Sequence, residues 1–240
     1  MNAQTDPIPD GAGISVPVPC PVAQSTPEPE AHFPIAQEGF AFIAAFGVLT
    51  GISAWASVRP LTLFFGLLTL FCLYFFRDPW RTVPQGEGIV LAPGDGRVVD
   101  LSRVEEEPFL KRSAVKVSIF LNVFDVHVNR APTDGRVIGV FYNPGRFFAA
   151  SAPKASLENE QNALVLETRT GERIVCVQIA GLIARRIVCR AKEGMTLRGG
   201  ERFGMIRFGS RLDLYLPITT DLRVAVGDRV RGGESVIGML

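Results

Sequence analysis

The sequence predicts a mainly β fold, an antiparallel barrel or sandwich, preceded by a hydrophobic helical hairpin. From about Gly88 onward, short β-prone runs such as "GIVLAP", "AVKVSIFLNV" and "ERIVCVQIAG" alternate with Gly, Pro and Asp. Two stretches of this region recur: "PGDGRVVDL" (93–101) resembles "PTDGRVIGV" (132–140), and "EGMTLRGGERFGMI" (193–206) resembles "VGDRVRGGESVIGM" (226–239). Two uncharged, apolar runs precede them. We therefore expect repeated strand-turn units behind a membrane-seeking segment.

The repeated units indicate a particular kind of β domain. A strand-turn unit that packs on its own copy is similar in pattern to the barrel-sandwich fold of lipoyl and biotinyl carrier domains, so we expect a barrel-sandwich-hybrid-like fold. A carrier attaches its prosthetic group to a lysine at an exposed turn. The corresponding turns here hold Gly-Asp-Gly, Thr-Asp-Gly and Arg-Gly-Gly. A non-enzymatic, carrier-like membrane adaptor is therefore the less well supported interpretation.

Residues 1–34 predict a disordered tail. Eight prolines stand there among small and acidic residues, a composition that buries too little apolar surface to fold. The tail contains no Lys or Arg, so it lacks the basic region of a signal peptide.

Residues 35–78 predict a membrane-anchor hairpin. The runs 39–58 and 61–76 carry no charge, and the first is long enough to cross a bilayer as a helix. The alternative, a buried soluble hairpin, would need a larger core than the remaining β-like chain can supply. Aromatic residues lie near the run ends, and three arginines follow the second run: Arg77, Arg81 and Arg97. This asymmetry favours a β domain on the cytoplasmic side, whether the hairpin spans the bilayer or dips into it.

Composition limits the possible chemistry. The chain of 240 residues has a formal net charge of +1, so we expect no nucleic-acid partner. Its four cysteines show no CxxC spacing and it has only two histidines, so neither a zinc site nor a disulfide framework is expected. Only one histidine, His127, lies in the predicted β domain.

The dipeptide Gly209-Ser210 stands where an apolar run gives way to an alternating one, in "MIRFGSRLDLYLP" (205–217). An ordinary turn is one interpretation. The other is self-cleavage, in which the Ser210 hydroxyl attacks the preceding carbonyl and an N-to-O acyl shift makes an ester. Gly209 has no side chain to block that approach. β-Elimination of the ester would cut the chain and leave dehydroalanine, which hydrolyses to a pyruvoyl group.

This chemistry needs a base near Ser210. The candidate is His127, in "LNVFDVHVNRAPTDG" (121–135), and the carboxylates expected to orient it are Asp95 and Asp125. Each also has an ordinary interpretation, as a core histidine or as a turn or strand-end aspartate.

Six segments in chain order carry a resemblance to a known family: "YFFRDPWRTVP", "LAPGDGRVV", "FDVHVNRAP", "LENEQN", "QIAGLIARRIV" and "RFGSRLDLYLP". Together they resemble the short, single-domain form of phosphatidylserine decarboxylase, from about Tyr74 to the end of the chain. The resemblance implies a proenzyme that cuts itself at Gly209-Ser210 into a large subunit, 1–209, and a small subunit, 210–240.

The same resemblance assigns roles within a catalytic domain at 79–240. The aspartate of the family's Pro-x-Asp-Gly motif falls on Asp95, and its first histidine falls on His127. Long-form relatives carry a second histidine where this chain has Arg130, so His127 is expected to serve both self-cleavage and turnover. The implied cofactor is a pyruvoyl group made from Ser210, with no metal and no pyridoxal phosphate.

The resemblance also implies the reaction and the partners. The pyruvoyl ketone would form a Schiff base with the serine amine and accept the electron pair left by CO2, converting phosphatidylserine to phosphatidylethanolamine. The partners would be the phospholipid bilayer and a second copy in a homodimer. A soluble-type pyruvoyl-dependent amino acid decarboxylase is the enzyme alternative, but it would need no anchor.

Substrate contacts are harder to place from the sequence. Phe147 and Phe148 beside Arg146 suit a lipid interface, or equally a packed loop. The family's acidic-amide motif would contact the headgroup ammonium or brace a loop; it falls on Glu158, Asn159, Glu160 and Asn162. Arg185 and Arg186 are candidates for neutralising a phosphate or carboxylate, or are simply solvated.

Overall fold

The computed structural model of the chain describes residues 18–19, 33–106, 108–145, 159–181, 186–207 and 210–240. Its helices are the short 3-10 helix η1 (Gln37–Gly39), α1 (Phe40–Trp55) and α2 (Arg59–Phe75). Its strands are β1 (Val18–Pro19), β2 (Ile89–Leu91), β3 (Gly96–Glu106), β4 (Arg112–Leu121), β5 (Val128–Arg130), β6 (Gly135–Asn143), β7 (Gln161–Glu167), β8 (Arg173–Ala180), β9 (Ile187–Cys189), β10 (Thr196–Leu197), β11 (Arg202–Ile206), β12 (Ser210–Pro217), β13 (Asp221–Leu222), β14 (Arg229–Val230) and β15 (Val236–Met239). The predicted fold class, mainly β behind a helical pair, is confirmed.

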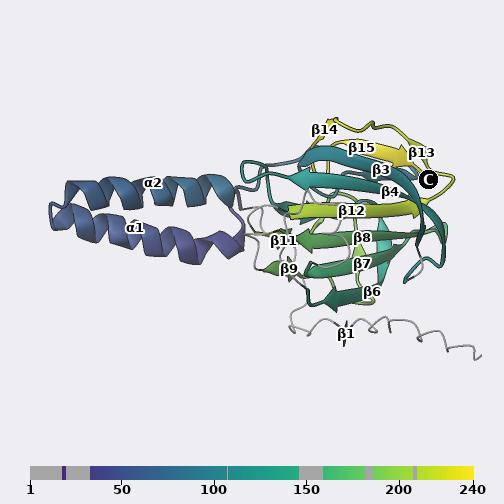
Figure 1. Ribbon diagram of the computed structural model, residues 1–240, viewed down its shortest axis with the longest axis horizontal. Helices are drawn as coiled ribbons and strands as arrows, with labels where there is room; N and C mark the ends of the chain where they lie inside the picture. Colours follow the sequence, from purple (N-terminus) through teal and green to yellow (C-terminus); the bar gives the residue numbers. More distant parts are fainter. Residues whose placement is uncertain (1–17, 20–32, 107, 146–158, 182–185, 208–209) are drawn as a thin grey trace, which may run out of the picture.

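The two helices form an antiparallel hairpin that projects from the β domain (Figure 1). The chain reverses between them at residues 56–58, where Ser57 takes a left-handed φ of 59°. Pro60 lies in the first turn of α2, a position whose backbone N–H has no partner within the helix. The uncharged runs of the sequence thus become two helices of similar length, as predicted.

Most of the hairpin is not covered by the described part of the β domain. Trp55 at the hairpin tip is 89% exposed, and Leu63 and Leu70 of α2 are 66% and 63% exposed. The helical stretch Gln37–Trp55 is long and apolar enough to cross a membrane, whereas α2 is shorter. Apolar side chains on a projecting hairpin need a partner other than water, and a lipid bilayer is such a partner.

The β domain is built around one large antiparallel sheet in the order β1-β6-β7-β8-β12-β4-β3-β14, with β10 also on β6. The sheet curls, and two small sheets, β5-β11-β9 and β13-β15-β2, complete the domain (Figure 1). β12 lies in the middle of the large sheet, paired along its length with β4 on one side and with β8 on the other.

The internal repeats of the sequence are two copies of one structural unit. In the first copy β2 and β3 pair with β15 and β14, and in the second β5 and β6 pair in the same way with β11 and β10. Backbone hydrogen bonds match as well: the amides of Ala92 and Val98 donate to the carbonyls of Ser235 and Asp228, as those of Ala131 and Val137 donate to Glu201 and Met195. The predicted repetition of strand-turn units is confirmed, but each unit of the early repeat pairs with a unit of the late repeat and not with its own copy.

The first "PxDG" turn packs tightly against the central strands. A Cβ on Gly94 would lie 2.6 Å from Cδ1 of Leu212 in β12. A Cβ on Gly96 would collide with the carbonyl oxygen of Phe120 in β4. Because only glycine allows the backbone to come this close, the two glycines fix the turn beside the start of β12.

The base of the hairpin is clasped to the β domain by Asp78, whose carboxylate is 1% exposed. One carboxylate oxygen lies 2.6 Å from Nη2 of Arg130 in β5, and the other lies 2.6 Å from Nε of Arg202 in β11. The two ends of the hairpin are joined to each other at the same place, since the amide of Ala36 donates to the carbonyl of Phe76 at 2.7 Å. The anchor and the β domain are thus joined by buried, charge-assisted contacts.

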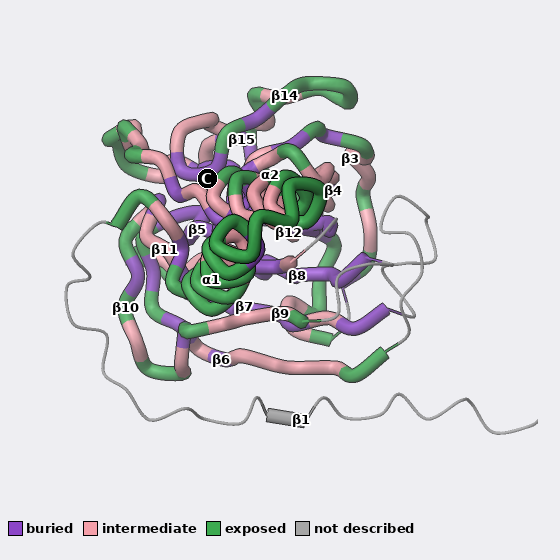
Figure 2. Tube along the Cα trace, turned by 90° about the vertical axis from the view of Figure 1, so that its left-hand side faces the viewer, coloured by how far each residue is buried: buried purple, intermediate pink, exposed green. Residues whose placement is uncertain are grey.

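The main core lies on one face of the large sheet. The residues of β12 on this face alternate along the strand: Ser210, Leu212, Leu214 and Leu216. They lie beside the core-facing residues of β4, which include Leu121, Ile119 and Val117. In Figure 2 the central strands are buried and the hairpin is mostly exposed. Ser210 therefore continues an apolar row at one end of the sheet.

We expect Asp78→Asn to lower the free energy of unfolding by about 3 kcal/mol, because it leaves the Arg130 guanidinium buried without its counter-charge. The measurement is denaturant unfolding of the detergent-solubilised protein. The control is Asp221→Asn, which removes an exposed ion pair with Arg223 and should cost less than about 1 kcal/mol. Equal, small losses in both variants would show that the Asp78 clasp does not hold the anchor.

Candidate active site

Ser210 is the first residue of β12 and lies between two strand ends. It pairs with Leu121, the last residue of β4, and with Ala180, the last residue of β8. Its side chain is fully buried, and its hydroxyl has no hydrogen-bond partner among the described residues. Burying a hydroxyl without a partner is unfavourable, so such a group calls for a functional explanation.

His127 is held as a neutral base. Its Nδ1 lies 2.9 Å from the backbone carbonyl oxygen of Asp125. A carbonyl only accepts, so Nδ1 carries the proton and Nε2 carries the lone pair. Burial lowers the pKa of His127 to about 4; the bond to Asp125 opposes this shift, and the charge of Arg77 adds to it. The ring packs on Phe75 of α2, with 4.3 Å between centroids.

Two pairings hold Ser210 and His127 at the same end of the sheet. Ser210 pairs with Leu121, and the amide of Ile206 donates to the carbonyl of His127 at 3.4 Å. Only five residues connect Leu121 to His127, and only three connect Ile206 to Ser210. The expected scissile bond, Gly209-Ser210, lies at the end of the connection from Ile206 to Ser210.

The predicted orienting role of the two carboxylates is wrong. Asp95 instead forms a bidentate ion pair with Arg81, with both distances 2.9 Å. The Asp125 carboxylate accepts a hydrogen bond from the amide of Asn122, and only the Asp125 backbone contacts the imidazole. Sequence spacing could not reveal that a backbone carbonyl orients His127, because every residue type has one. It also could not reveal the Arg81–Asp95 pair, because Arg81 belongs to the segment that follows the hairpin.

Comparison with known proteins shows the family of the chain. Residues 68–238 match the phosphatidylserine decarboxylase family. The chain is 52% identical over 210 residues to the phosphatidylserine decarboxylase proenzyme of Nitrosomonas europaea, covering 86% of this chain and 95% of that protein. It belongs to the phosphatidylserine decarboxylase family. The proenzymes of Geotalea uraniireducens and Desulfotalea psychrophila are 49% and 47% identical, each over 86% of this chain and 97% of the relative.

The acidic-amide motif of this phosphatidylserine decarboxylase family member braces the strand beside Ser210. The side-chain amide of Asn159 donates to the carbonyl of Ala180 at 2.7 Å, and the amide of Ala180 donates to the carbonyl of Glu160 at 2.9 Å. Ala180 is the residue paired with Ser210. Asn159 and Glu160 therefore fix the end of β8, which lies beside Ser210 at the start of β12.

A buried chain of amides lies on the Ser210 face of the sheet. Nδ2 of Asn162 donates to Oε1 of Gln178 at 2.9 Å, and Nε2 of Gln178 donates to Oδ1 of Asn129 at 2.8 Å. The Nδ2 group of Asn129 has no partner among the described residues. Sequence reasoning named Asn162 but missed Gln178 and Asn129. Strand alternation was the available signal, since Asn129 follows His127 by two residues.

Arg130 does not replace the second histidine of long-form relatives. Its guanidinium is occupied by Asp78 and by the carbonyl of Gly200, at 2.6 Å and 3.0 Å. Arg186 is exposed. Five of the predicted site residues lie outside the described residues: Phe147, Phe148, Glu158, Arg185 and Gly209.

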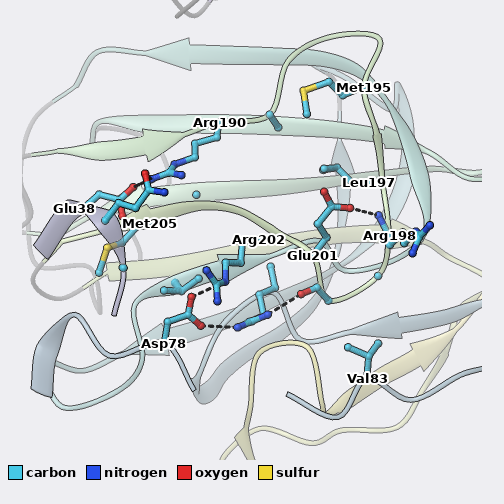
Figure 3. Close-up of a pocket in the computed structure, with 18 of the residues that line it drawn as sticks. Glu38, Asp78, Val83, Arg190, Met195, Leu197, Arg198, Glu201, Arg202 and Met205 are labelled. Atoms are coloured by element: carbon cyan, nitrogen blue, oxygen red, sulfur yellow. Dashed lines mark hydrogen bonds and ion pairs between the residues drawn. The ribbon is translucent and has the colours of Figure 1, made fainter. Parts of the chain in front are cut away.

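A cavity of about 730 Å³ lies at the base of the hairpin, next to η1 and β11 (Figure 3). Four of its charged side chains form ion pairs: Arg202 contacts Asp78, and Arg190 contacts Glu38 at 2.8 Å. Its described lining includes neither Ser210 nor His127. The buried Ser210, and not this cavity, is therefore the basis of the candidate site.

We expect His127 to titrate with a pKa of about 4 instead of the 6.5 of a free histidine. In the unfolded chain the proton binds near pH 6.5, so the folded state loses stability as the pH falls from 6.5 through 4. NMR of the histidine-labelled Ser210→Ala chain measures this titration, and His32→Gln assigns the only other histidine signal. A midpoint near 6.5 for His127 would contradict a buried neutral base.

Proposed function

We propose that this chain cuts itself between Gly209 and Ser210 and then decarboxylates phosphatidylserine at the pyruvoyl group formed at residue 210. The observation that carries the proposal is the fully buried Ser210 hydroxyl, which lacks a hydrogen-bond partner in the described part of the chain. It lies at the sheet end that also holds the neutral base His127. The relatives are named phosphatidylserine decarboxylase proenzymes, in agreement with both steps.

Self-cleavage begins when Ser210 Oγ gives its proton to Nε2 of His127. A bond forms between Oγ and the carbonyl carbon of Gly209, and the C–N bond breaks as the amine nitrogen of residue 210 takes the proton. His127 then removes the Cα proton of residue 210, the Gly209 carboxylate leaves, and water converts the dehydroalanine to the pyruvoyl group with release of ammonia. Full burial of Ser210 keeps competing water from the first step.

The site fits a pyruvoyl group, since the Ser210 side chain is already buried without a polar partner among the described residues and the new group is small and uncharged. When present, the group supplies a ketone that reacts with the substrate amine and accepts the electron pair released with CO2. The residues of this chain then bind the substrate and position the reacting groups. Asn159 and Glu160 hold β8 in place, and Phe75 holds the imidazole. Nε2 of His127 returns a proton to the headgroup α-carbon.

The hairpin inserts into the bilayer, with the β domain on the cytoplasmic side. Helices of 16 and 17 residues are about 24–26 Å long, against a hydrocarbon core of about 30 Å. Arg59 at the tip extends far enough to place its charge among the opposite headgroups. At the other end, Trp80 is 75% exposed and Phe124 is 62% exposed, and both suit the near headgroup layer. The sheet end that carries Ser210 then faces the lipid.

We expect Ser210→Ala to remain a single chain and to release no CO2 from phosphatidylserine, because neither the ester nor the ketone can form. Intact mass and a CO2-release assay measure the two outcomes. The matched control is Ser118→Ala, since Ser118 is also a buried serine without a partner among the described residues but lies on the opposite face of the sheet. This control should yield two fragments, the smaller with a keto-acyl terminus.

A single unbroken wild-type chain that still decarboxylates phosphatidylserine would overturn the proposal. Activity on free amino acids in place of phosphatidylserine would instead support the soluble-type decarboxylase.

We expect the triple change Leu63→Ser, Leu67→Ser and Leu70→Ser to weaken vesicle binding by at least about tenfold, since each exposed leucine loses the transfer free energy of an apolar side chain. Co-sedimentation with phospholipid vesicles measures the loss, and self-cleavage should proceed normally. The matched control changes three exposed apolar residues of the β domain to serine: Val99, Ile218 and Val226. Equal effects of the two triple changes would remove the hairpin from the membrane contact.

A further inference from the structure

Arg207 lies between the hairpin and the reacting serine. It follows the last residue of β11, Ile206, whose side chain faces the main core, whereas Met205 packs among residues of the hairpin base. Alternation along the strand puts Arg207 on the hairpin side. Its guanidinium lies over the ring of Phe42 in α1, 5.4 Å from the centroid.

Arg207 differs from the other sheltered arginines. Six described arginines are buried or partly buried. Five of them bind carboxylates or carbonyl oxygens: Arg77, Arg81, Arg130, Arg202 and Arg211. Arg207 makes no hydrogen bond or ion pair to a described residue, and its Nε is buried. A buried guanidinium Nε without an acceptor is unfavourable unless an acceptor arrives with a ligand.

A second unpaired cation lies close by, because Ile206 pairs with Ile187 of the antiparallel strand β9 and the next position of this register sets Arg207 opposite Arg186. Arg186 is exposed and makes no hydrogen bond or ion pair to a described residue. Burial and the charge of Arg186 both lower the pKa of Arg207, and Glu38 opposes them only in part. Glu38 is itself held by Arg190 at 2.8 Å. Two adjacent guanidinium groups with no carboxylate of their own favour an anion between them.

We propose that Arg207, together with Arg186, binds the phosphodiester of the phosphatidylserine headgroup. Before cleavage Arg207 and Ser210 are three positions apart in the chain, so their Cα atoms lie at most about 11 Å apart. Two carbons and one oxygen separate the reacting amine from the phosphorus. An extended arginine side chain covers the remaining distance. The contact with Phe42 at the base of α1 places the guanidinium at the depth of the lipid headgroups. This inference rests on the proposed function.

The test compares two substrates that differ in the phosphodiester: monomeric dihexanoyl-phosphatidylserine and O-hexyl-L-serine, which has no phosphate. Detergent-solubilised Arg207→Gln should self-cleave fully and raise KM for the phospholipid by about tenfold to a hundredfold, as expected for a lost charge-assisted contact. KM for O-hexyl-L-serine should not change. Arg207→Lys should recover part of the loss, since it keeps the charge but not the planar fork. The control is Arg198→Gln, which removes an equal charge from an exposed position of the β domain, and KM should stay within about twofold.

The outcomes separate the alternatives. An unchanged KM for the phospholipid, or an equal rise for both substrates, would overturn the inference. A variant that differs only in binding to vesicles containing phosphatidylglycerol would also overturn it, because the pair would then serve the surrounding lipid. If Arg207→Gln does not self-cleave, Arg186→Gln, a change at an exposed residue, tests the inference through the same comparison of KM for the two substrates. A wild-type protein inactive on dihexanoyl-phosphatidylserine would contradict the proposed function itself.

Discussion

The pairing of β12 between β4 and β8 is the constraint on which the rest of the site depends. It puts Ser210 at the end of an apolar row, where the sheet itself excludes water and supplies no polar partner from the described residues. Asn159 and Glu160 hold the neighbouring strand end, and the glycines of the first "PxDG" turn let the backbone close on the same point. The proposed nucleophile is therefore positioned by backbone pairing more than by a set of charged side chains.

The anchor is part of the same arrangement. α2 ends on Phe75, which packs on His127, and a few residues later Asp78 joins two arginines from β5 and β11. A hairpin that only tethered the enzyme would need neither contact. Because the imidazole is buried by the anchor helix, the low pKa of His127 depends on a segment outside the β domain. In the proposed mechanism, lipid binding and proton transfer thus share one structural element.

Much of this could be predicted from local patterns in the sequence. The uncharged runs predicted the hairpin, and the repeated "PxDG" and "RGG" stretches predicted the paired units. The single histidine of the β domain, His127, together with the Gly209-Ser210 dipeptide, predicted the candidate site. The rest depends on segments far apart in the chain. Gln178 donates a hydrogen bond to Asn129, which lies 49 positions away in the chain. The Asp95 carboxylate binds Arg81 and not the imidazole of His127. No spacing rule anticipates that a backbone carbonyl orients His127, since every residue carries one.

The expected cut falls between the two copies of the late repeat, and this has a consequence for the life of the molecule. The downstream fragment would contribute β12 to the middle of the large sheet, and β14 and β15 to partners near the start of the domain. These interlocked pairings can be made while the chain is still continuous. Once it is severed, renaturation becomes a second-order encounter between two polypeptides, one of them only 31 residues long if the cut precedes Ser210. The mature enzyme would then refold poorly after denaturation, and its lifetime would be set by the rate at which it unfolds.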